Sequence, residues 1–305
     1  MNRLFLLCSL ALCAIGSPLL AGCQAPESAG RLGFNARHYY QGKALELARA
    51  VDRKDAAAIQ RLIKEEGVDP DTLFDGKGMP LVAWPLVTHN LEGLRLLLEA
   101  GADPNARHRP VVRDDLPGAN NAMVFAAGME DRRYLELLLD HGGDPNTRTM
   151  GRNPLTYAAW LANRWPNVQL LIERGADVNY RKQGNKNNRP IDWYAGLGNF
   201  EQVYWLLQHG ADPTTATESS EYLQGDATSP TLLHIFYKPV QDWARPWQEK
   251  CQVWVLERGI KRPPMLEYIR ENREQLGLPT REEDIPLPAY ELLPEFAAEP
   301  TAVHN

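Results

Sequence analysis

Leucine-rich segments recur along the middle of the chain. The runs LRLLLEA, LELLLDH, VQLLIER and VYWLLQH place apolar residues at helical spacing, and each of them ends beside a glycine. Each run therefore predicts an amphipathic helix. The phrases MPLVAW, NPLTYAAW and RPIDWYAG lie upstream of such runs and open a preceding helix. The hydrophobic pattern predicts pairs of helices repeated along the chain.

The phrase that follows each leucine-rich run is also repeated. It reads EGVDPD, AGADPN, HGGDPN, RGADVN and HGADPT, with a weaker echo RGIKRP, and the glycine-to-glycine steps are 34, 41, 33, 35 and 49 residues. The glycine fits the left-handed conformation that ends a helix, and proline shortly afterwards prevents the helix from resuming. The longer steps indicate insertions, which we place at 106–121, between Thr214 and Ser229, and within 237–248.

These phrases closely resemble ankyrin repeats, in which a β-turn finger precedes two antiparallel helices with a period near 33 residues. The resemblance covers about Ala44 to Ile260. It implies an all-α ankyrin-repeat solenoid of about six helix-turn-helix units, with a degenerate first unit as a terminal cap. We expect the repeat domain over 44–262, a C-terminal capping helix over 263–277 and a Pro-rich acidic tail, extended or disordered, over 278–305.

The first residues predict export and lipidation. Arg3 precedes an apolar run from Leu4 to Ile15, which is shorter than the roughly 20 residues of a spanning helix and is typical of a secretory signal. The segment LAGC, ending at Cys23, resembles the lipobox of bacterial lipoprotein precursors. The resemblance implies a signal peptide over 1–22, a lipid on Cys23 and a lipidated linker over 23–43. An ordinary signal peptide with an accidental cysteine is the alternative.

Cysteine usage and charge narrow the function classes. Cys8 and Cys13 would leave with the signal and Cys23 would be blocked, so Cys251 is expected to remain alone as a buried packing residue. A disulfide within the mature chain is then excluded. The formal net charge of −6 argues against a nucleic-acid partner, which requires a basic face.

The sequence contains none of the catalytic motifs that we sought: a G-x-S-x-G elbow, an H-E-x-x-H pair, a phosphate-binding glycine loop or a C-x-x-C pair. His141 and His209 precede helix-ending glycines, where a cation is favourable. His234 occupies a position at which ankyrin repeats use histidine for local hydrogen bonds. The recurring aspartates are expected to be structural, since successive repeats hold them too far apart to share an ion. We expect a protein that is not an enzyme and that needs no cofactor or metal.

Ankyrin arrays bind partners through the finger tips and the exposed face of the first helices. The position after the P-L-H phrase is expected to face this groove, and in successive units it holds Ala83, Phe125, Tyr157, Trp193 and Ile235. Aromatic residues dominate interface hot spots, so the aromatic candidates for partner binding are Phe125, Tyr157, Trp160 and Trp193. Packing against neighbouring repeats is the alternative for these side chains.

Charge is concentrated in three successive fingers, 105–121, 146–153 and 179–189, which hold nine basic and two acidic residues. A basic row on an acidic body suggests steering toward an acidic partner. Ordinary finger composition accounts for the row equally well, and anionic lipid is a further candidate target. The basic candidates for partner binding are Arg107, Arg109, Arg148, Arg152, Arg181 and Lys182, and the other basic members are Arg113, Lys186 and Arg189.

The combination of lipobox, ankyrin groove and absent catalytic motif resembles the ankyrin-type immunity lipoproteins that inhibit type VI secretion phospholipase effectors. The resemblance implies a periplasmic, lipid-anchored protein that neutralises a secreted lipase effector by stoichiometric binding. Gln24 resembles the outer-membrane sorting pattern and favours the outer over the inner membrane. The alternative function is a periplasmic scaffold or stress-protection factor that holds a resident protein at the membrane.

Overall fold

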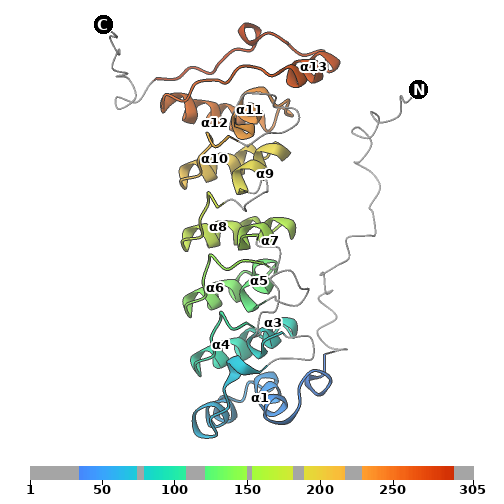
Figure 1. Ribbon diagram of the computed structural model, residues 1–305, viewed down its shortest axis with the longest axis vertical. Coiled ribbons are helices and arrows are strands. Elements are labelled where there is room, and N and C mark those ends of the chain that lie inside the picture. The colour runs from blue at the N-terminus through green and yellow to red at the C-terminus, as the bar shows by residue number, and fades with distance from the viewer. Residues whose placement is uncertain are drawn as a thin grey trace, which may run out of the picture.

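Pairs of antiparallel helices stack along one axis in the computed structural model (Figure 1). The structure describes residues 34–73, 79–107, 121–149, 153–180, 189–216 and 229–291. Residues 1–33 lie outside these ranges, and they include the expected signal peptide, Cys23 and the first part of the expected linker. In the described part the pairs are α1 (Gly42–Asp52) with α2 (Ala56–Gln60), α3 (Trp84–Val87) with α4 (Leu91–Glu99), α5 (Ala122–Ala127) with α6 (Arg133–Asp140), α7 (Leu155–Leu161) with α8 (Trp165–Glu173), α9 (Pro190–Leu197) with α10 (Phe200–Gln208), and α11 (Pro230–Tyr237) with α12 (Arg245–Glu257).

The first helices of the pairs form one layer and the second helices form another (Figure 1). Each first helix contacts the first helix of the next pair, from α3 through α11, and α4 contacts α6 as α10 contacts α12. No strand occurs among the described residues, and an isolated antiparallel bridge joins Arg148 to Pro154. The all-α solenoid expected from the repeats is confirmed.

A glycine in the left-handed conformation follows the second helical segment of every pair. Its φ lies between 65° and 105° in all six cases, which are Gly67, Gly101, Gly142, Gly175, Gly210 and Gly259. An L side chain at this backbone angle would be strained, whereas glycine adopts it readily. The prediction that this glycine ends each helix is confirmed.

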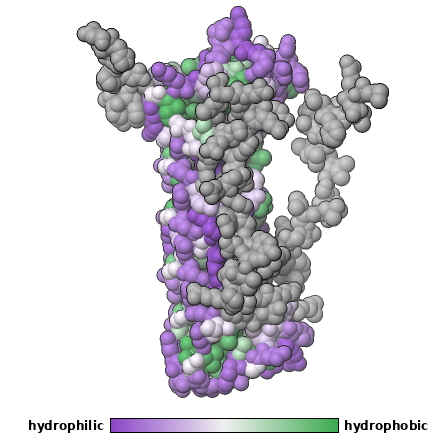
Figure 2. Space-filling view, viewed as in Figure 1, coloured by the Kyte–Doolittle hydropathy of each residue, from purple (hydrophilic) through white to green (hydrophobic). Residues whose placement is uncertain are grey.

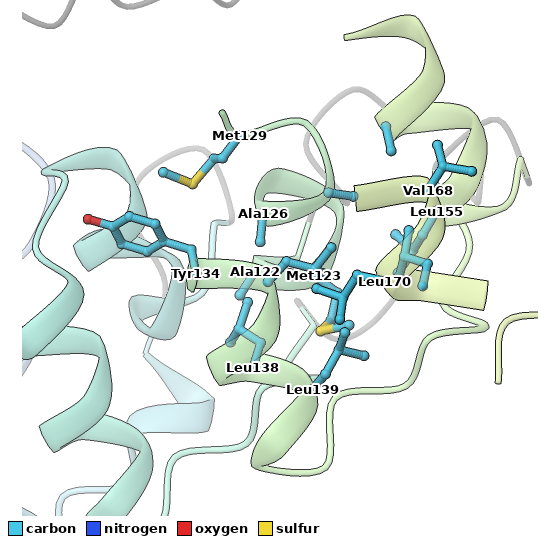
Figure 3. Close-up of a cluster of buried hydrophobic side chains, with 14 of the residues drawn as sticks. Ala122, Met123, Ala126, Met129, Tyr134, Leu138, Leu139, Leu155, Val168 and Leu170 are labelled. Atoms are coloured by element: carbon cyan, nitrogen blue, oxygen red, sulfur yellow. The ribbon is translucent and has the colours of Figure 1, made fainter. Parts of the chain in front are cut away.

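Leucine and valine side chains of the second helices fill the space between the layers. Residues three apart are completely buried in four successive helices: Leu94 and Leu97, Leu135 and Leu138, Val168 and Leu171, Val203 and Leu206. Burial of one such side chain contributes about 1.5–3 kcal/mol. Figure 3 shows how side chains of α5, α6, α7 and α8 meet, with Met123, Leu155 and Leu170 lying together between two pairs. The core is therefore continuous from pair to pair, as in other solenoids.

Asparagine side chains join the ends of successive pairs. Asn146 donates from Nδ2 to the carbonyl oxygen of Gly175 at 3.0 Å, and its Oδ1 accepts from the backbone N–H of Asp177 at 2.9 Å. Asn105 makes the same two bonds to Gly142 and Asp144, and Asn179 makes them to Gly210 and Asp212. Each aspartate of the phrase accepts from the backbone N–H two residues later, as Asp144 does from Asn146 at 2.8 Å. These aspartates have a structural role.

We expect Asn146→Ala to lower the free energy of unfolding by about 1–2 kcal/mol, because it removes both bonds between two neighbouring units. Urea unfolding followed by far-ultraviolet circular dichroism measures the change. Asn272→Ala is the matched control, since Asn272 is exposed on the C-terminal helix α13. Equal stability of the two variants would contradict a role for Asn146 in joining the repeats.

The array ends in helix α13 (Glu267–Gln275), which is tied to the sixth pair. Tyr237 donates from its hydroxyl to the carbonyl oxygen of Pro263 at 2.5 Å, and the buried Arg273 donates to the carbonyl oxygens of Tyr237 and Pro279 at 2.8 and 2.7 Å. Glu282 accepts from the backbone N–H of Met265 at 2.7 Å. The first part of the expected acidic tail is thus bonded to the end of the array.

The face of the molecule seen in Figure 2 is mostly hydrophilic, with hydrophobic side chains gathered near the two ends of the array. No helix in the described part of the chain combines the length and apolarity that crossing a bilayer requires. Cys251 is completely buried, and burial raises the pKa of its thiol. The packing role expected for this cysteine agrees with its place in α12.

Candidate functional site

Aromatic and aliphatic side chains gather on the first helices of the fourth and fifth pairs. The ring centroids of Tyr157 and Trp160 on α7 are 5.7 Å apart, and those of Trp160 and Trp193 on α9 are 5.1 Å apart. Tyr157 and Trp193 are separated by 5.2 Å. Such geometries contribute about 0.5–1.5 kcal/mol per aromatic pair beyond burial. The three rings form one cluster that spans two repeats.

Two exposed leucines extend this cluster along the same helix faces. Leu161 lies four residues after Tyr157 and is 63% exposed, and Leu197 lies four residues after Trp193 and is 61% exposed. Residues four apart share a face of an α-helix. We call these five side chains the apolar patch. Exposed apolar side chains that form one contiguous patch mark interaction surfaces.

The sequence interpretation missed both leucines. Their spacing of four residues from Tyr157 and Trp193 could have placed them on the same helix faces. The residue type did not indicate exposure, because leucine also fills the core of this protein. Exposure distinguishes Leu161 and Leu197 from the buried leucines of the second helices.

The neighbouring repeats leave room for the indole of Trp160. The matching positions, three residues after Phe125 and Trp193, are Gly128 and Gly196. A β-carbon at Gly196 would have only one neighbour within 4 Å, the imidazole of His234 at 3.9 Å. The position of Trp160 is thus occupied by glycine in the repeats on both sides.

The expectation that every residue after the P-L-H phrase faces the groove is wrong at both ends of the column. Ala83 and Ile235 are completely buried. Trp193 is only 8% exposed, because Tyr157 and Trp160 pack against it, whereas Phe125 on α5 and Tyr157 are half-buried. The alternative interpretation, packing against a neighbouring repeat, therefore fits Ala83, Trp193 and Ile235 better.

Two arginines of successive fingers lie close to each other. Arg107 donates from Nη2 to the backbone carbonyl oxygen of Arg148 at 3.1 Å, and the guanidinium carbon of Arg148 lies 3.6 Å from the ring centroid of Tyr180. The bridge between Arg148 and Pro154 fixes this finger at the start of α7. Within the described residues neither arginine forms an ion pair with a carboxylate. Both guanidinium groups keep donors for an incoming anion.

The basic row has fewer exposed cations than the sequence suggested. Arg189 is 1% exposed and forms a buried ion pair with Asp192, so it contributes no surface charge. The expectation that Arg189 belongs to the basic surface is wrong, because its own helix supplies the carboxylate three residues later. Arg109, Arg113, Arg152, Arg181, Lys182 and Lys186 lie outside the described residues.

The histidines have structural environments. Nδ1 of His141 lies 2.9 Å from the carbonyl oxygen of Leu137, and Nδ1 of His209 lies 2.7 Å from that of Trp205, each at a helix C-terminus. Burial lowers the pKa of His234 to about 4, so its imidazole is neutral near pH 7 and too weak a base for general-base catalysis at that pH. No cluster of three or more possible metal ligands occurs in the described parts of the chain.

Comparisons with known proteins agree with this architecture. The family description "Ankyrin repeats (3 copies)" matches residues 110–182. Protein PhlB of Serratia liquefaciens is 33% identical over 141 residues, which are 44% of this chain and 55% of that protein. The ankyrin repeat and KH domain-containing protein mask-1 of Caenorhabditis elegans is 29% identical over 53% of this chain and 6% of its own length. The chain thus spans about half, or much less, of these relatives.

A solved structure shows the same fold. The ankyrin repeat domain of Bcl-3 superimposes with a TM-score of 0.51 at 23% sequence identity, over 69% of this chain and 85% of that one. Ankyrin domains are typically non-catalytic binding scaffolds, although palmitoyltransferases such as AKR1 of Lachancea kluyveri are also similar over a small part of their length, 11%. The chain contains ankyrin repeats, a fold that indicates a protein–protein interaction module.

Proposed function

We propose that the protein is a membrane-tethered periplasmic inhibitor that neutralises a secreted lipase effector by stoichiometric binding, as an immunity protein of a type VI secretion system. The apolar patch on α7 and α9 is the observation that carries the binding part of this proposal. Aromatic and aliphatic side chains would supply the desolvated centre of an interface, and the finger arginines would supply positive charge to it.

The location rests on the sequence. The lipobox-like segment ending at Cys23 is the support for a lipid anchor, and Gln24 favours the outer membrane. The similarity to Protein PhlB adds that a bacterial protein carries a related repeat segment. The lipase as target, and the type VI system that delivers it, rest on the resemblance of the whole architecture to ankyrin-type immunity lipoproteins.

Survival of cells tests the inhibitory role. Cells that lack this chain should lose viability when the product of the adjacent gene is directed to their periplasm, and the full chain supplied in trans should restore growth. A chain with Trp160→Ala should restore less growth at equal abundance. Undiminished survival of the deletion strain would overturn the inhibitory role. Co-purification of a resident envelope protein without any lipase would instead favour a scaffold.

Charge reversal of the finger arginines should act mainly on association. Arg107→Glu with Arg148→Glu is expected to slow the association rate about tenfold or more at low salt and to weaken its salt dependence, because it replaces two positive charges of neighbouring fingers with negative ones. Stopped-flow fluorescence with the captured partner measures the rate. Arg49→Glu with Arg132→Glu changes the net charge equally at exposed positions elsewhere and serves as control. Equal slowing by both pairs would contradict local steering.

A further inference from the structure

A second surface, on the outer side of the last helix pair, interleaves tryptophans with basic residues. Trp243 precedes α12, and Trp247, Lys250, Trp254 and Arg258 follow at steps of four, three, four and four residues. These steps place the four residues within α12 and at its end on one helix face. We call the five residues the tryptophan stripe. It lies on the layer opposite to the first helices that carry the apolar patch (Figure 1).

The stripe faces outward instead of closing on the core. Trp243 is 71% exposed, more than any other large hydrophobic side chain among the described residues. Trp247 and Trp254 are half-buried against the core, so each presents one part of its ring at the surface. The buried Cys251 and Val255 lie on the flank of α12 beside the stripe and pack this helix onto the core.

Cations of the same helix lie over the indole rings. The Nζ of Lys250 is 4.0 Å from the ring centroid of Trp247 and 5.9 Å from that of Tyr204 on α10. The guanidinium carbon of Arg258 is 3.8 Å from the ring centroid of Trp254. Among the ion pairs of the described residues, none joins Lys250 or Arg258 to a carboxylate. Both charges therefore remain available to an external anion.

The sign of the charge around the stripe is opposite to that of the chain. Residues 238–262 hold six basic and three acidic side chains, a net charge of +3, whereas the whole chain carries −6. Tryptophan and tyrosine are enriched at the boundary between hydrocarbon and headgroups, and lysine and arginine extend their charges toward phosphates there. Each lysine or arginine near an anionic bilayer strengthens binding to it about fivefold.

We propose that the tryptophan stripe docks on a bilayer surface that contains anionic phospholipid headgroups. Lys250 and Arg258 contact phosphates, and Trp243, Trp247 and Trp254 enter the headgroup layer with their exposed ring edges. The stripe lies apart from the apolar patch, so docking leaves the patch accessible to a protein. This inference does not rest on the proposed inhibitory function.

The stripe complements a lipid at Cys23, if that cysteine is modified as proposed. Phe34, the first described residue, follows Cys23 by eleven positions, a length of chain that can span at most about 40 Å. A lipid would tether the first helix pair, and the stripe would hold the sixth. The array would then lie along the bilayer instead of standing on it.

Vesicle flotation tests the proposal without any contribution from lipidation. The full chain carrying Cys23→Ser is mixed with vesicles of phosphatidylcholine alone or of phosphatidylcholine with phosphatidylglycerol. We expect partition with the vesicles that contain phosphatidylglycerol and little with the neutral ones. Lys250→Glu with Arg258→Glu should lower this partition on the order of 30-fold, and Trp243→Ala should lower it as well.

Arg49→Glu with Arg132→Glu is the matched control, since it changes the net charge equally at exposed positions outside the stripe. Circular dichroism and the melting temperature of each variant show whether it is folded. If the charge reversals prevent folding, Trp243→Ala still tests the proposal, because Trp243 is exposed and lies before α12. Equal partition onto both vesicle types, or equal losses in the stripe and control variants, would overturn the proposal. A stripe variant that loses a protein partner while its vesicle binding is unchanged would also overturn it, and would identify a protein interface.

Discussion

Asp192→Ala is expected to lower the free energy of unfolding by about 3–5 kcal/mol, because it leaves the buried guanidinium of Arg189 without its carboxylate partner. The side chains of Arg189 and Asp192 are each 2% exposed. Arg189 donates from Nε and Nη2 to the two carboxylate oxygens at 2.9 and 2.7 Å. This bidentate pair is shielded from the water that weakens surface ion pairs.

The same pair joins three repeat segments. Arg189 also donates to the carbonyl oxygen of Asp212 at 2.7 Å, in the phrase after α10. Thr231 on α11 donates to the carboxylate of Asp192 at 2.6 Å. Loss of the carboxylate should therefore loosen the fifth and sixth pairs together, and repeat arrays unfold segment by segment when one boundary weakens.

Urea unfolding and hydrogen exchange measure this prediction. Asp192→Ala should lose exchange protection first in α9 and α11, whereas Asp242→Ala, which removes an exposed carboxylate paired with Arg245 at 3.5 Å, should change stability by less than about 1 kcal/mol. The double variant Arg189→Met with Asp192→Leu should recover part of the loss, because it removes both charges. A cost of Asp192→Ala as small as that of Asp242→Ala would contradict the buried network.

Leu161→Asp combined with Leu197→Asp is expected to weaken partner binding by about 100-fold or more, because it places two charges in the centre of the proposed interface. Both side chains are more than half exposed, so the variant should fold normally. Surface plasmon resonance with the captured partner should show mainly faster dissociation. This variant is a sharper probe than Trp193→Ala, since Trp193 is nearly buried and its removal would also disturb packing.

Leu276→Asp is the matched control for the patch variant. Leu276 is 50% exposed and follows α13, away from the fourth and fifth pairs. It should bind the partner as the parent chain does. Affinity that is unchanged in the patch variant, with its melting temperature unchanged as well, would mean that the partner binds elsewhere on the array.

The repeat architecture was predictable because its signals are local. A helix of 3.6 residues per turn requires apolar side chains three and four positions apart, and its end requires a residue that tolerates positive φ. Both requirements are met within about ten residues of Gly101, Gly142 and Gly175. The structural role of Asp144 and Asp177 was likewise accessible, since each bonds to the backbone only two residues away.

The surface was less predictable because exposure depends on the neighbouring repeat. Trp193 and Tyr157 occupy the same position of the repeat, yet the first is nearly buried and the second is half-buried. Trp193 is covered by Tyr157 and Trp160, which come from the preceding repeat. The expected hot spot at Trp193 is thus largely internal. Leu161 was overlooked because a leucine in a helix resembles a core residue until its neighbours are known.

The amino-acid sequence alone specified an all-α array of helix pairs, the residue that ends each pair and the structural aspartates, because these depend on dihedral preferences and on contacts close along the chain. The tertiary structure decided which side chains reach solvent: it buried Arg189 with Asp192, covered Trp193, and exposed Leu161, Leu197 and Trp243. The reason is physical. A repeat buries its side chains against residues about one repeat length away, and that packing distance is encoded in no local pattern.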